Sequence, residues 1–154
     1  SDKGAKGERV DESGPAAKEM LEGAGYEVVE CLILPDEPAA LKTQLKRLAD
    51  GRQVALVVTS GGTGFSMRDQ TPEATMAVAD RNAPGIAEYI RYRSMEKTSR
   101  AMLSRGVSVI RGKTLIVNLP GSPKAVRESL EFILEPVEHG LEILRGTALE
   151  CGRK

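Results

Sequence analysis

The sequence is poor in aromatic residues, with two Phe, three Tyr and no Trp among 154 residues. Proteins that bind single-stranded nucleic acid stack successive bases on aromatic side chains, so this composition disfavours that mode of binding. Net charge is lacking as well, because 22 basic residues balance 22 acidic ones. Non-specific DNA binding depends on an excess of Lys and Arg. We therefore expect no nucleic acid among the partners.

Long apolar runs, histidine and cysteine are also scarce. No run approaches the ~20 apolar residues that a membrane span needs, so we expect no membrane partner. The one histidine, His139, disfavours a histidine-based metal site and a Ser-His-Asp triad. Two cysteines, Cys31 and Cys151, cannot build a disulfide framework. We expect a cytoplasmic protein without an export signal.

What the sequence does contain is an alternation of short apolar runs and amphipathic segments. Arg111-Gly112-Lys113 joins two of the runs and predicts a tight hairpin, and Pro136 is expected to interrupt the last helix. The pattern predicts strands at Glu27–Leu34, Val54–Thr59, Val107–Ile110 and Thr114–Leu119, and helices at Pro15–Ala24, Glu37–Asp50, Pro72–Arg81, Ile86–Lys97, Pro123–Leu134 and Val137–Arg145.

This alternation predicts one α/β domain over residues 1–154, with three layers and a mainly parallel sheet flanked by helices. Val54–Val58 is five apolar residues in a row, as in a strand buried on both faces. A doubly wound fold normally begins with a strand, whereas no strand precedes the first helix in this sequence. We therefore expect a first strand upstream of Ser1, with Ser1–Glu12 at the same sheet edge as Gly61–Gly64.

A glycine-rich turn follows the run Val54–Thr59. Gly61, Gly62 and Gly64 stand where this strand ends, and ligands of open α/β sheets bind at such strand ends. Glycine there either serves a tight turn with positive φ or lets backbone N–H groups approach a phosphate. The turn has neither the Walker nor the dinucleotide signature. The Thr71-Pro72 pair after it predicts a helix with the threonine as its N-cap.

Two aspartates follow strand ends. Asp69 either bonds to the start of the next helix or offers a carboxylate to Mg²⁺ that is held together with substrate phosphates. Asp36 follows the run Glu27–Leu34 and is either the N-cap of the next helix or a second ligand of that metal. Because strand ends in this fold meet at one sheet edge, we expect both carboxylates to face a common cleft.

A second turn at a strand end is Leu119-Pro120-Gly121-Ser122-Pro123-Lys124. It is either a well-made turn with a helix N-cap, or an anion site built from N–H groups, a hydroxyl and Lys124. Between Tyr89 and Lys113 the sequence also holds seven cations and one acid. This stretch is either a solvated, ion-paired face or a region that attracts a polyanion such as a nucleoside triphosphate. Its cations are Arg91, Arg93, Lys97, Arg100, Arg105, Arg111 and Lys113.

Together these motifs resemble the molybdenum-cofactor biosynthesis proteins of the MogA/MoaB type, the molybdopterin adenylyltransferases. The resemblance covers nearly the whole chain in the order of that family, and GGTG, RDxTPEA and LPGSP are its most specific parts. The matching segments are SDKGAKGERVDESGP at Ser1–Pro15, LPDE at Leu34–Glu37, TSGGTGFSMRDQTPEA at Thr59–Ala74, PGIAE at Pro84–Glu88 and AMLSRGVSVIRGKTLIVNLPGSPKAV at Ala101–Val126, with the terminal helix through His139.

The resemblance implies a compact α/β domain, usually trimeric, that transfers AMP from Mg-ATP to the terminal phosphate of molybdopterin and releases pyrophosphate. By motif, Asp36 and Asp69 are the aspartates that catalysis needs, and we expect Mg²⁺ on both. A molybdate-insertion protein of the same pathway is a further expected partner. The residues implied in substrate binding are Asp2, Ser13, Ser60, Gly61, Gly62, Thr63, Gly64, Pro120, Gly121, Ser122 and Pro123.

Two other functions compete with this one. A non-catalytic pterin-binding or assembly module of the MoaB type has the same fold, but the retention of both Asp36 and Asp69 favours the enzyme. A generic nucleotide-binding domain agrees only with the glycine-rich loop, and it leaves the RDQTPEA and LPGSP matches unexplained.

Overall fold

The computed structural model describes residues 11–147, which contain a four-stranded sheet in the order β1-β4-β3-β2. β4 (Thr114–Leu119) pairs in parallel with β1 (Leu56–Ser60) and antiparallel with β3 (Ser108–Arg111). β3 pairs antiparallel with β2 (Arg81–Asn82). The predicted hairpin is confirmed, with Gly112 in its turn at φ 56°. The expected α/β sheet is therefore present in mixed form, because this hairpin adds an antiparallel neighbour to β4.

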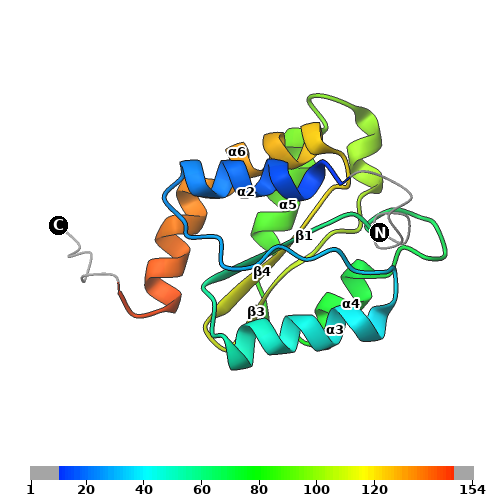
Figure 1. The fold of residues 1–154 in the computed structure, drawn as a ribbon. Helices are drawn as coiled ribbons and strands as arrows, with labels where there is room; N and C mark the ends of the chain where they lie inside the picture. The colour runs from blue at the N-terminus through cyan, green and yellow to red at the C-terminus, as the bar shows by residue number, and fades with distance from the viewer. Residues whose placement is uncertain (1–10, 148–154) are drawn as a thin grey trace.

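Helices cover both faces of the sheet (Figure 1). α2 (Ser13–Gly23), α5 (Pro84–Ser94) and α6 (Pro123–Leu144) lie over one face, whereas α3 (Pro38–Lys46) and α4 (Thr71–Ala77) lie over the other. A π-helical turn, η1 (Arg47–Gly51), follows α3, and a 3-10 turn, η2 (Ser99–Leu103), follows α5. The three-layer arrangement is confirmed. Within residues 11–147, no helix has the length and hydropathy of a membrane span.

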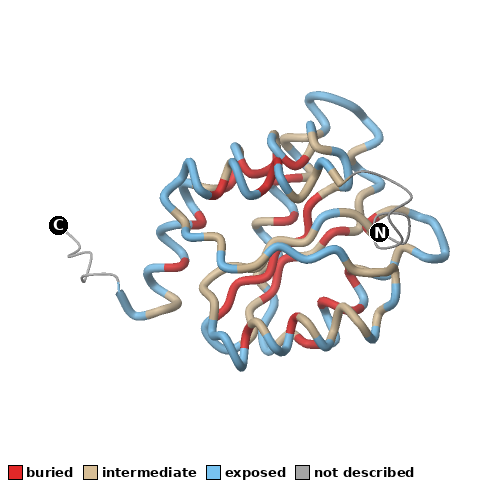
Figure 2. The backbone as a smooth tube through the Cα atoms, viewed as in Figure 1, coloured by how far each residue is buried: buried red, intermediate tan, exposed pale blue. Residues whose placement is uncertain are grey.

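β4 separates two apolar cores and is buried along its whole length (Figure 2). Leu115, Val117 and Leu119 point into the core shared with α2, α5 and α6, whereas Ile116 points into the core shared with α3. Side chains alternate across a strand, which explains this division. β1 is only half-buried, so the expectation that Val54–Val58 is buried on both faces is wrong. In the described sheet β1 is an edge strand with β4 as its one neighbour.

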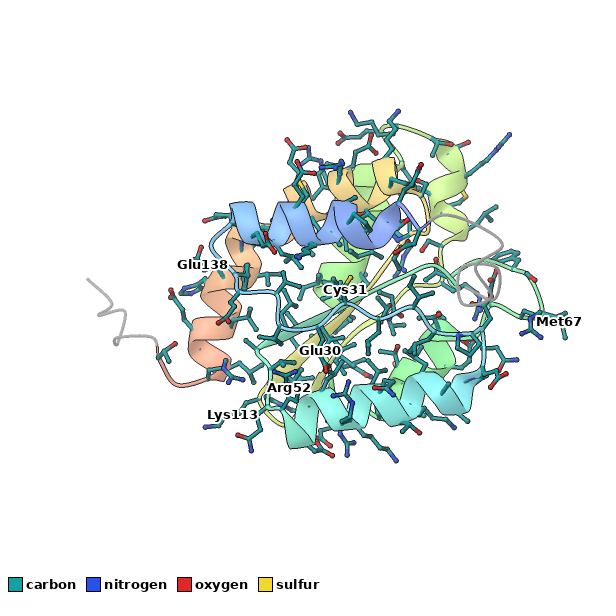
Figure 3. All side chains as sticks on the ribbon, in the orientation of Figure 1. Glu30, Cys31, Arg52, Met67, Lys113 and Glu138 are labelled. Carbon is teal, nitrogen blue, oxygen red and sulfur yellow. The ribbon has the colours of Figure 1, made fainter. Side chains whose placement is uncertain are left out.

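The segment Glu27–Leu34, predicted as a strand, is an extended trace outside the sheet. Side chains attach it to the protein instead of a ladder of backbone bonds. Glu30 accepts both guanidinium nitrogens of Arg47, at 3.1 and 2.7 Å, and lies 3.2 Å from a nitrogen of Arg52 (Figure 3). An apolar, β-branched pattern is therefore not sufficient for a strand, since this segment stays outside the described sheet although β1 has one unpaired edge there. Its outward side chains are Val29, Leu32 and Ile33, each between 44% and 49% exposed.

Two helices differ from prediction. α4 ends at Ala77 rather than Arg81, because the chain joins the sheet there: the backbone N–H of Asp80 donates to the carbonyl of Ile110, and β2 follows. α6 runs without a break through Pro136, which removes only one backbone donor. The residues before and after Pro136 pack against the same core through one continuous buried stripe. The stripe consists of Val126, Ser129, Leu130, Ile133, Val137 and Leu141.

Candidate active site

Two loops leave the sheet side by side at the carboxyl ends of β1 and β4. The strands are in parallel register with Ser60 opposite Leu119, so the residues after each strand start at the same edge. The backbone N–H of Gly61 donates to the carbonyl of Leu119 at 3.1 Å, and the Ser60 hydroxyl donates to the carbonyl of Pro120 at 3.0 Å. Ser60 therefore joins the two loops to each other.

Glycine is favoured in the loop that follows β1, where two positions have positive φ. A Cβ on Gly121 would lie 3.4 Å from the Cα of Gly61, so the two backbones are in van der Waals contact. Gly61 and Gly62 have φ of 89° and 68°, a region that other residues rarely adopt. A Cβ on Gly62 would lie 2.2 Å from Oγ1 of Thr71, at the start of α4. The predicted turn with positive φ is confirmed, and close backbone approach comes with it.

The start of α2 is attached to the same edge. The Ser13 hydroxyl donates to the carbonyl of Gly121 at 2.6 Å, and Asp11 accepts the backbone N–H groups of Ser13 and Gly14 at 3.2 Å each. The structure thus brings Ser13 to the predicted site, where it holds a loop carbonyl. Asp2, predicted beside it, lies outside the described residues.

Asp69 closes a tight turn between the glycine loop and α4. Its carboxylate accepts the backbone N–H of Ser66 at 3.1 Å, and its own N–H donates to the carbonyl of Ser66 at 2.9 Å. Thr71 is the first residue of α4 rather than its N-cap, and its N–H donates to the carbonyl of Gly62. The prediction of Thr71 as N-cap is wrong, because the glycine loop supplies the acceptor that a capping side chain would have supplied.

Asp36 lies beside this turn. The N-cap of α3 is Glu37, so the interpretation of Asp36 as that N-cap is wrong. A guanidinium nitrogen of Arg68 lies 3.4 Å from the carbonyl of Asp36, which connects the segment that ends at Asp36 to the neighbour of Asp69. The structure therefore places the two aspartate-bearing segments next to each other, as the sequence predicted for one sheet edge.

The last predicted element is the start of α6. Ser122 is its N-cap, with the hydroxyl accepting the backbone N–H of Ala125 at 3.1 Å, and Pro123 occupies the first turn. Both points confirm the sequence prediction. The first turn of a 22-residue helix leaves backbone N–H groups without helical partners, and its dipole favours an anion there.

An open hollow of about 490 Å³ lies against the Asp69 turn. Met67 projects from the tip of the turn (Figure 3) and is 90% exposed, and Phe65 is 70% exposed. The hollow combines these apolar side chains with a few polar and charged groups, as small-molecule sites do. Its lining residues are Phe65, Ser66, Met67, Asp69, Gln70, Glu73 and Arg105.

Four of the seven cations between Tyr89 and Lys113 are held by groups of the protein. Arg91 donates to the carbonyls of Ser104 and Gly106, and Arg93 contacts Tyr89 and Glu96. The other two are Arg105, which contacts the glycine loop, and Arg111, which pairs with Asp50 and donates to the carbonyl of Val78. The ion-paired interpretation is therefore correct for Arg93, Arg105 and Arg111, which pair with Glu96, Glu73 and Asp50, whereas Arg91 is held by backbone carbonyls.

Sequence reasoning missed a buried polar cluster behind the site. The amide nitrogen of Asn118 donates to the hydroxyls of Thr59 and Thr75 at 2.9 and 3.0 Å. Its amide oxygen accepts the N–H of Val107 at 3.1 Å, and its side chain is 3% exposed. This one side chain joins β1, β4 and α4 just below the two loops. The only local signal was a polar residue inside an apolar strand run.

The donor chemistry of the site fits Mg²⁺ that arrives with a nucleotide. Among residues 11–147, no cluster of three or more His, Cys, Asp or Glu side chains is placed to hold a metal by itself. Mg²⁺ bound with substrate phosphates needs only one or two carboxylates. Asp36 and Asp69 are acids of that kind.

Comparison with known proteins gives a consistent family. Residues 1–139 match the family described as "Probable molybdopterin binding domain". The chain is 44% identical over 135 residues to the molybdopterin adenylyltransferase of Haemophilus influenzae, with 86% of this chain and 68% of that one covered. It is 43% identical over 148 residues to the enzyme of the same name from Escherichia coli K12, with 92% and 75% covered.

A solved structure agrees with the sequence relatives. The crystal structure of the molybdopterin biosynthesis enzyme MoaB from Thermus thermophilus superposes with a TM-score of 0.90 at 49% identity. The match covers 95% of this chain and 92% of that one, so sequence and fold agree over almost the same length. The chain therefore belongs to the molybdopterin-binding-domain family of molybdenum cofactor biosynthesis proteins.

Proposed function

We propose that this protein is a molybdopterin adenylyltransferase, which transfers AMP from Mg-ATP to the phosphate of molybdopterin. One observation carries the proposal: the two glycine-containing loops touch backbone to backbone at one sheet edge, with the Asp69 turn and the Asp36 segment beside them. Family membership adds the identity of the substrates, because the relatives named above carry this activity in their names.

The reaction joins two anions. An oxygen of the pterin phosphate attacks the α-phosphorus of ATP, the bond from that phosphorus to the bridging oxygen breaks, and pyrophosphate leaves with the electron pair. The attacking phosphate oxygen is already ionised at neutral pH, so the reaction requires no general base. The protein must instead offset charge repulsion and hold the two phosphates in line.

The chain offers groups for both tasks. We assign the backbone of Gly61–Gly64, Gly121 and the first turn of α6 to the pterin phosphate, because helix starts and glycine turns present N–H groups to anions. Ser60 and Ser13 hold this surface in shape through the carbonyls of Pro120 and Gly121. The remaining predicted residues, Thr63, Pro120, Ser122 and Pro123, belong to the same two loops, and Asp2 stays a prediction.

Asp36 and Asp69 are assigned to Mg²⁺. Bound there, the ion would neutralise charge on the triphosphate. Asp69 is held for this by its turn, whose N–H at Ser66 fixes one carboxylate oxygen at 3.1 Å. The proposal also includes Mg²⁺ and ATP as cofactor and co-substrate. It further includes a homotrimeric assembly, a molybdate-insertion protein as partner and a cytoplasmic site of action.

The proposed trimer would need an apolar contact surface, and the described residues offer a candidate. Large apolar side chains are exposed along α5 and η2, and apolar surface of this kind is typical of subunit contacts. They are Tyr89, Tyr92, Met95, Met102 and Leu103, between 39% and 66% exposed. Light scattering at micromolar concentration tests this point, and a strictly monomeric species would contradict it.

The test of the function is adenylyl transfer itself. Purified protein receives molybdopterin, ATP and Mg²⁺, and adenylylated pterin and pyrophosphate are followed. We expect product that depends on Mg²⁺ and falls at least about 100-fold in Asp36→Asn and Asp69→Asn, because each change removes a charged metal ligand. Asp80→Asn is the matched control, since Asp80 also accepts a turn N–H, that of Gly112 at 2.7 Å, but does so at the β3–β4 hairpin.

The outcome also separates the competing functions. Molybdopterin binding without any product would establish the binding or assembly module in place of the enzyme. ATP binding that is independent of any pterin would point to a generic nucleotide-binding domain. Full turnover in Asp69→Asn would overturn the assignment of that carboxylate.

A further inference from the structure

Arg105 contacts several points of one segment, Thr63–Glu73, and its side-chain partners lie 32 to 41 residues earlier in the chain. It lies between η2 and β3, and its backbone N–H donates to the carbonyl of Thr63 at 2.8 Å. Its Nε donates to the carbonyl of Gly64 at 2.8 Å, and one terminal nitrogen donates to the carbonyl of Asp69. The other terminal nitrogen forms an ion pair with Glu73 in the first turn of α4.

The two carbonyls that the side chain holds are the two ends of one loop. Gly64 and Asp69 bracket the exposed tip that carries Phe65 and Met67, so a single guanidinium closes the base of the loop. The carbonyl of Asp69 belongs to the residue whose carboxylate we assign to Mg²⁺. Arg105 therefore sets the backbone from which that carboxylate projects.

The residue is itself held in place. Arg91, on α5, donates to the carbonyls of Ser104 and Gly106 at 3.3 and 2.6 Å, one on each side of Arg105. Hydrogen bonds from α5 thus hold the backbone around Arg105, while the side chain of Arg105 holds the loop. A chain of contacts runs from a packed helix to the carboxylate of the site.

We propose that Arg105 is a positioning residue for adenylyl transfer, whose guanidinium fixes the loop Gly64–Asp69 so that the carboxylate of Asp69 and the wall of the adjoining hollow stand ready for substrate. This inference rests on the proposed function and adds a residue to it. The planar fork of arginine suits the task, because it donates in several fixed directions at once, whereas lysine acts as a point charge. In this role Nε and both terminal nitrogens are used by protein acceptors rather than by a substrate phosphate.

The test compares Arg105 with a second arginine that does the same work elsewhere. Arg145 donates to the carbonyls of Gln53, Val54 and Lys113 at 3.0, 3.4 and 2.9 Å, at the opposite end of the strands. Arg105→Met, Arg105→Lys, Glu73→Gln and Arg145→Met are assayed for AMP transfer, with kcat and the KM values for ATP and molybdopterin measured separately. Hydrogen exchange of the peptide covering residues 62–70 and the melting temperature are measured on the same samples.

We expect kcat to fall about 100-fold in Arg105→Met with both KM values within about threefold, because misplacement of a catalytic group lowers the rate more than it lowers binding. Arg105→Lys should recover less than about tenfold of this loss, since it restores charge without the fork. Glu73→Gln leaves both hydrogen bonds from Arg105 to the loop carbonyls in place, so it should lower kcat less than Arg105→Met or Arg105→Lys does. Millimolar guanidinium should partly restore kcat in Arg105→Met, and residues 64–70 should exchange faster in that variant.

Arg145→Met separates positioning from stability. We expect it to lower the melting temperature about as much as Arg105→Met while kcat stays within about twofold. Equal losses of kcat in the two variants would overturn the proposal, as would unchanged kcat in Arg105→Met. A KM for ATP that rises more than about tenfold at constant kcat would make Arg105 a phosphate-binding residue instead.

Failure of the proposed function leaves a different signature. If the unmodified protein transfers no AMP, the function is overturned and exchange decides the role of Arg105. Faster exchange of residues 64–70 in Arg105→Met, without a change in Arg145→Met, then supports the positioning role, and unchanged exchange overturns it.

Discussion

The two ends of the β1–β4 pair use the same stabilising devices for different purposes. At the carboxyl end, Arg105 bridges loop carbonyls and Asp69 accepts a turn N–H. At the amino end, Arg145 bridges carbonyls of the neighbouring turns, while Asp80 accepts the N–H of Gly112 in the hairpin at that end. Guanidinium–carbonyl bridges and aspartate-closed turns therefore do not by themselves mark a functional site.

What distinguishes the carboxyl end is the contact between two glycine backbones and the convergence of helix starts. A Cβ on Gly61 or Gly121 would be in van der Waals contact with the Cα of the other, Gly61 also has positive φ, and α2, α4 and α6 all begin beside them. Bare backbone and helix N-termini present N–H groups, which the hairpin end presents only at a single turn. This difference supports the proposal that a polyanion binds at the carboxyl end of the pair.

The largest difference between the two ends is expected when one methyl group is added to a glycine at each end. Gly62→Ala meets Thr71 and also takes up a left-handed conformation, so we expect a loss of about 2–4 kcal/mol of stability and of nearly all AMP transfer. Gly112→Ala has the same backbone strain at φ 56°, but its Cβ would stand in open space. We therefore expect a stability loss of about 1 kcal/mol and unchanged AMP transfer. Urea denaturation and the transfer assay measure both, and equal losses in both variants would contradict the comparison.

The next largest loss of stability is expected in the buried polar cluster beneath the loops. Asn118→Ala leaves the N–H of Val107 and two threonine hydroxyls without their partner, and we expect it to cost about 2–3 kcal/mol. Asn82→Ala on the exposed edge strand β2 is the control and should stay within about 0.5 kcal/mol. If urea denaturation gives the same midpoint for both variants, Asn118 does not hold β1, β4 and α4 together.

A smaller effect is expected for the link between α2 and the Pro-Gly loop. Ser13→Ala removes one hydrogen bond to the carbonyl of Gly121, so we expect a stability loss of about 1 kcal/mol and molybdopterin binding that is weaker by at most about fivefold. Thr43→Ala removes a hydroxyl that also bonds a backbone carbonyl, that of Ala39, but on the other face of the sheet. Calorimetric titration should show weaker binding in the first variant only.

The smallest effect concerns pH and lies outside the site. The hydrogen bond from Arg47, helped by Arg52, holds the pKa of Glu30 below its ordinary value of 4.5. A carboxyl with a lowered folded-state pKa stabilises the protein above its unfolded pKa, and this contribution is lost as pH falls through the folded pKa. Glu30→Gln should therefore melt below the unmodified protein at about pH 7 and approach it below pH 4.5. A difference that stays constant from about pH 7 to about pH 3 would contradict this.

Sequence reasoning succeeded where the determining contacts are local. The Ser122-Pro123 pair identifies a helix start because a serine hydroxyl can reach an N–H only three residues away. Gly61 and Gly62 predicted positive φ because a turn must follow a strand that ends there. The place of the site followed from one general rule about strand ends, and the structure does bring Ser13, the two loops and both aspartate segments to that edge.

It did not succeed where the partner is distant in sequence. Nothing near Arg105 distinguishes it from six other cations, because its acceptors at Gly64 and Asp69 lie 41 and 36 residues away. Thr71 has the sequence of an N-cap, yet the carbonyl of Gly62 takes its place as acceptor. Glu27–Leu34 has a strand pattern, but it stays outside the described sheet, and Glu30 attaches it through Arg47 and Arg52.

The extended segment Glu27–Leu34 is expected to open locally before the sheet does. Its attachment by the Glu30 ion pairs and by Tyr26 and Val28, which pack against the larger core, leaves the segment outside the ladder that protects the amides of β4. Side-chain attachments of this kind open with less free energy than the sheet does. Deuterium should enter residues 27–34 long before it enters β4. Asp36 follows this segment two residues later, so we expect its backbone to exchange early as well.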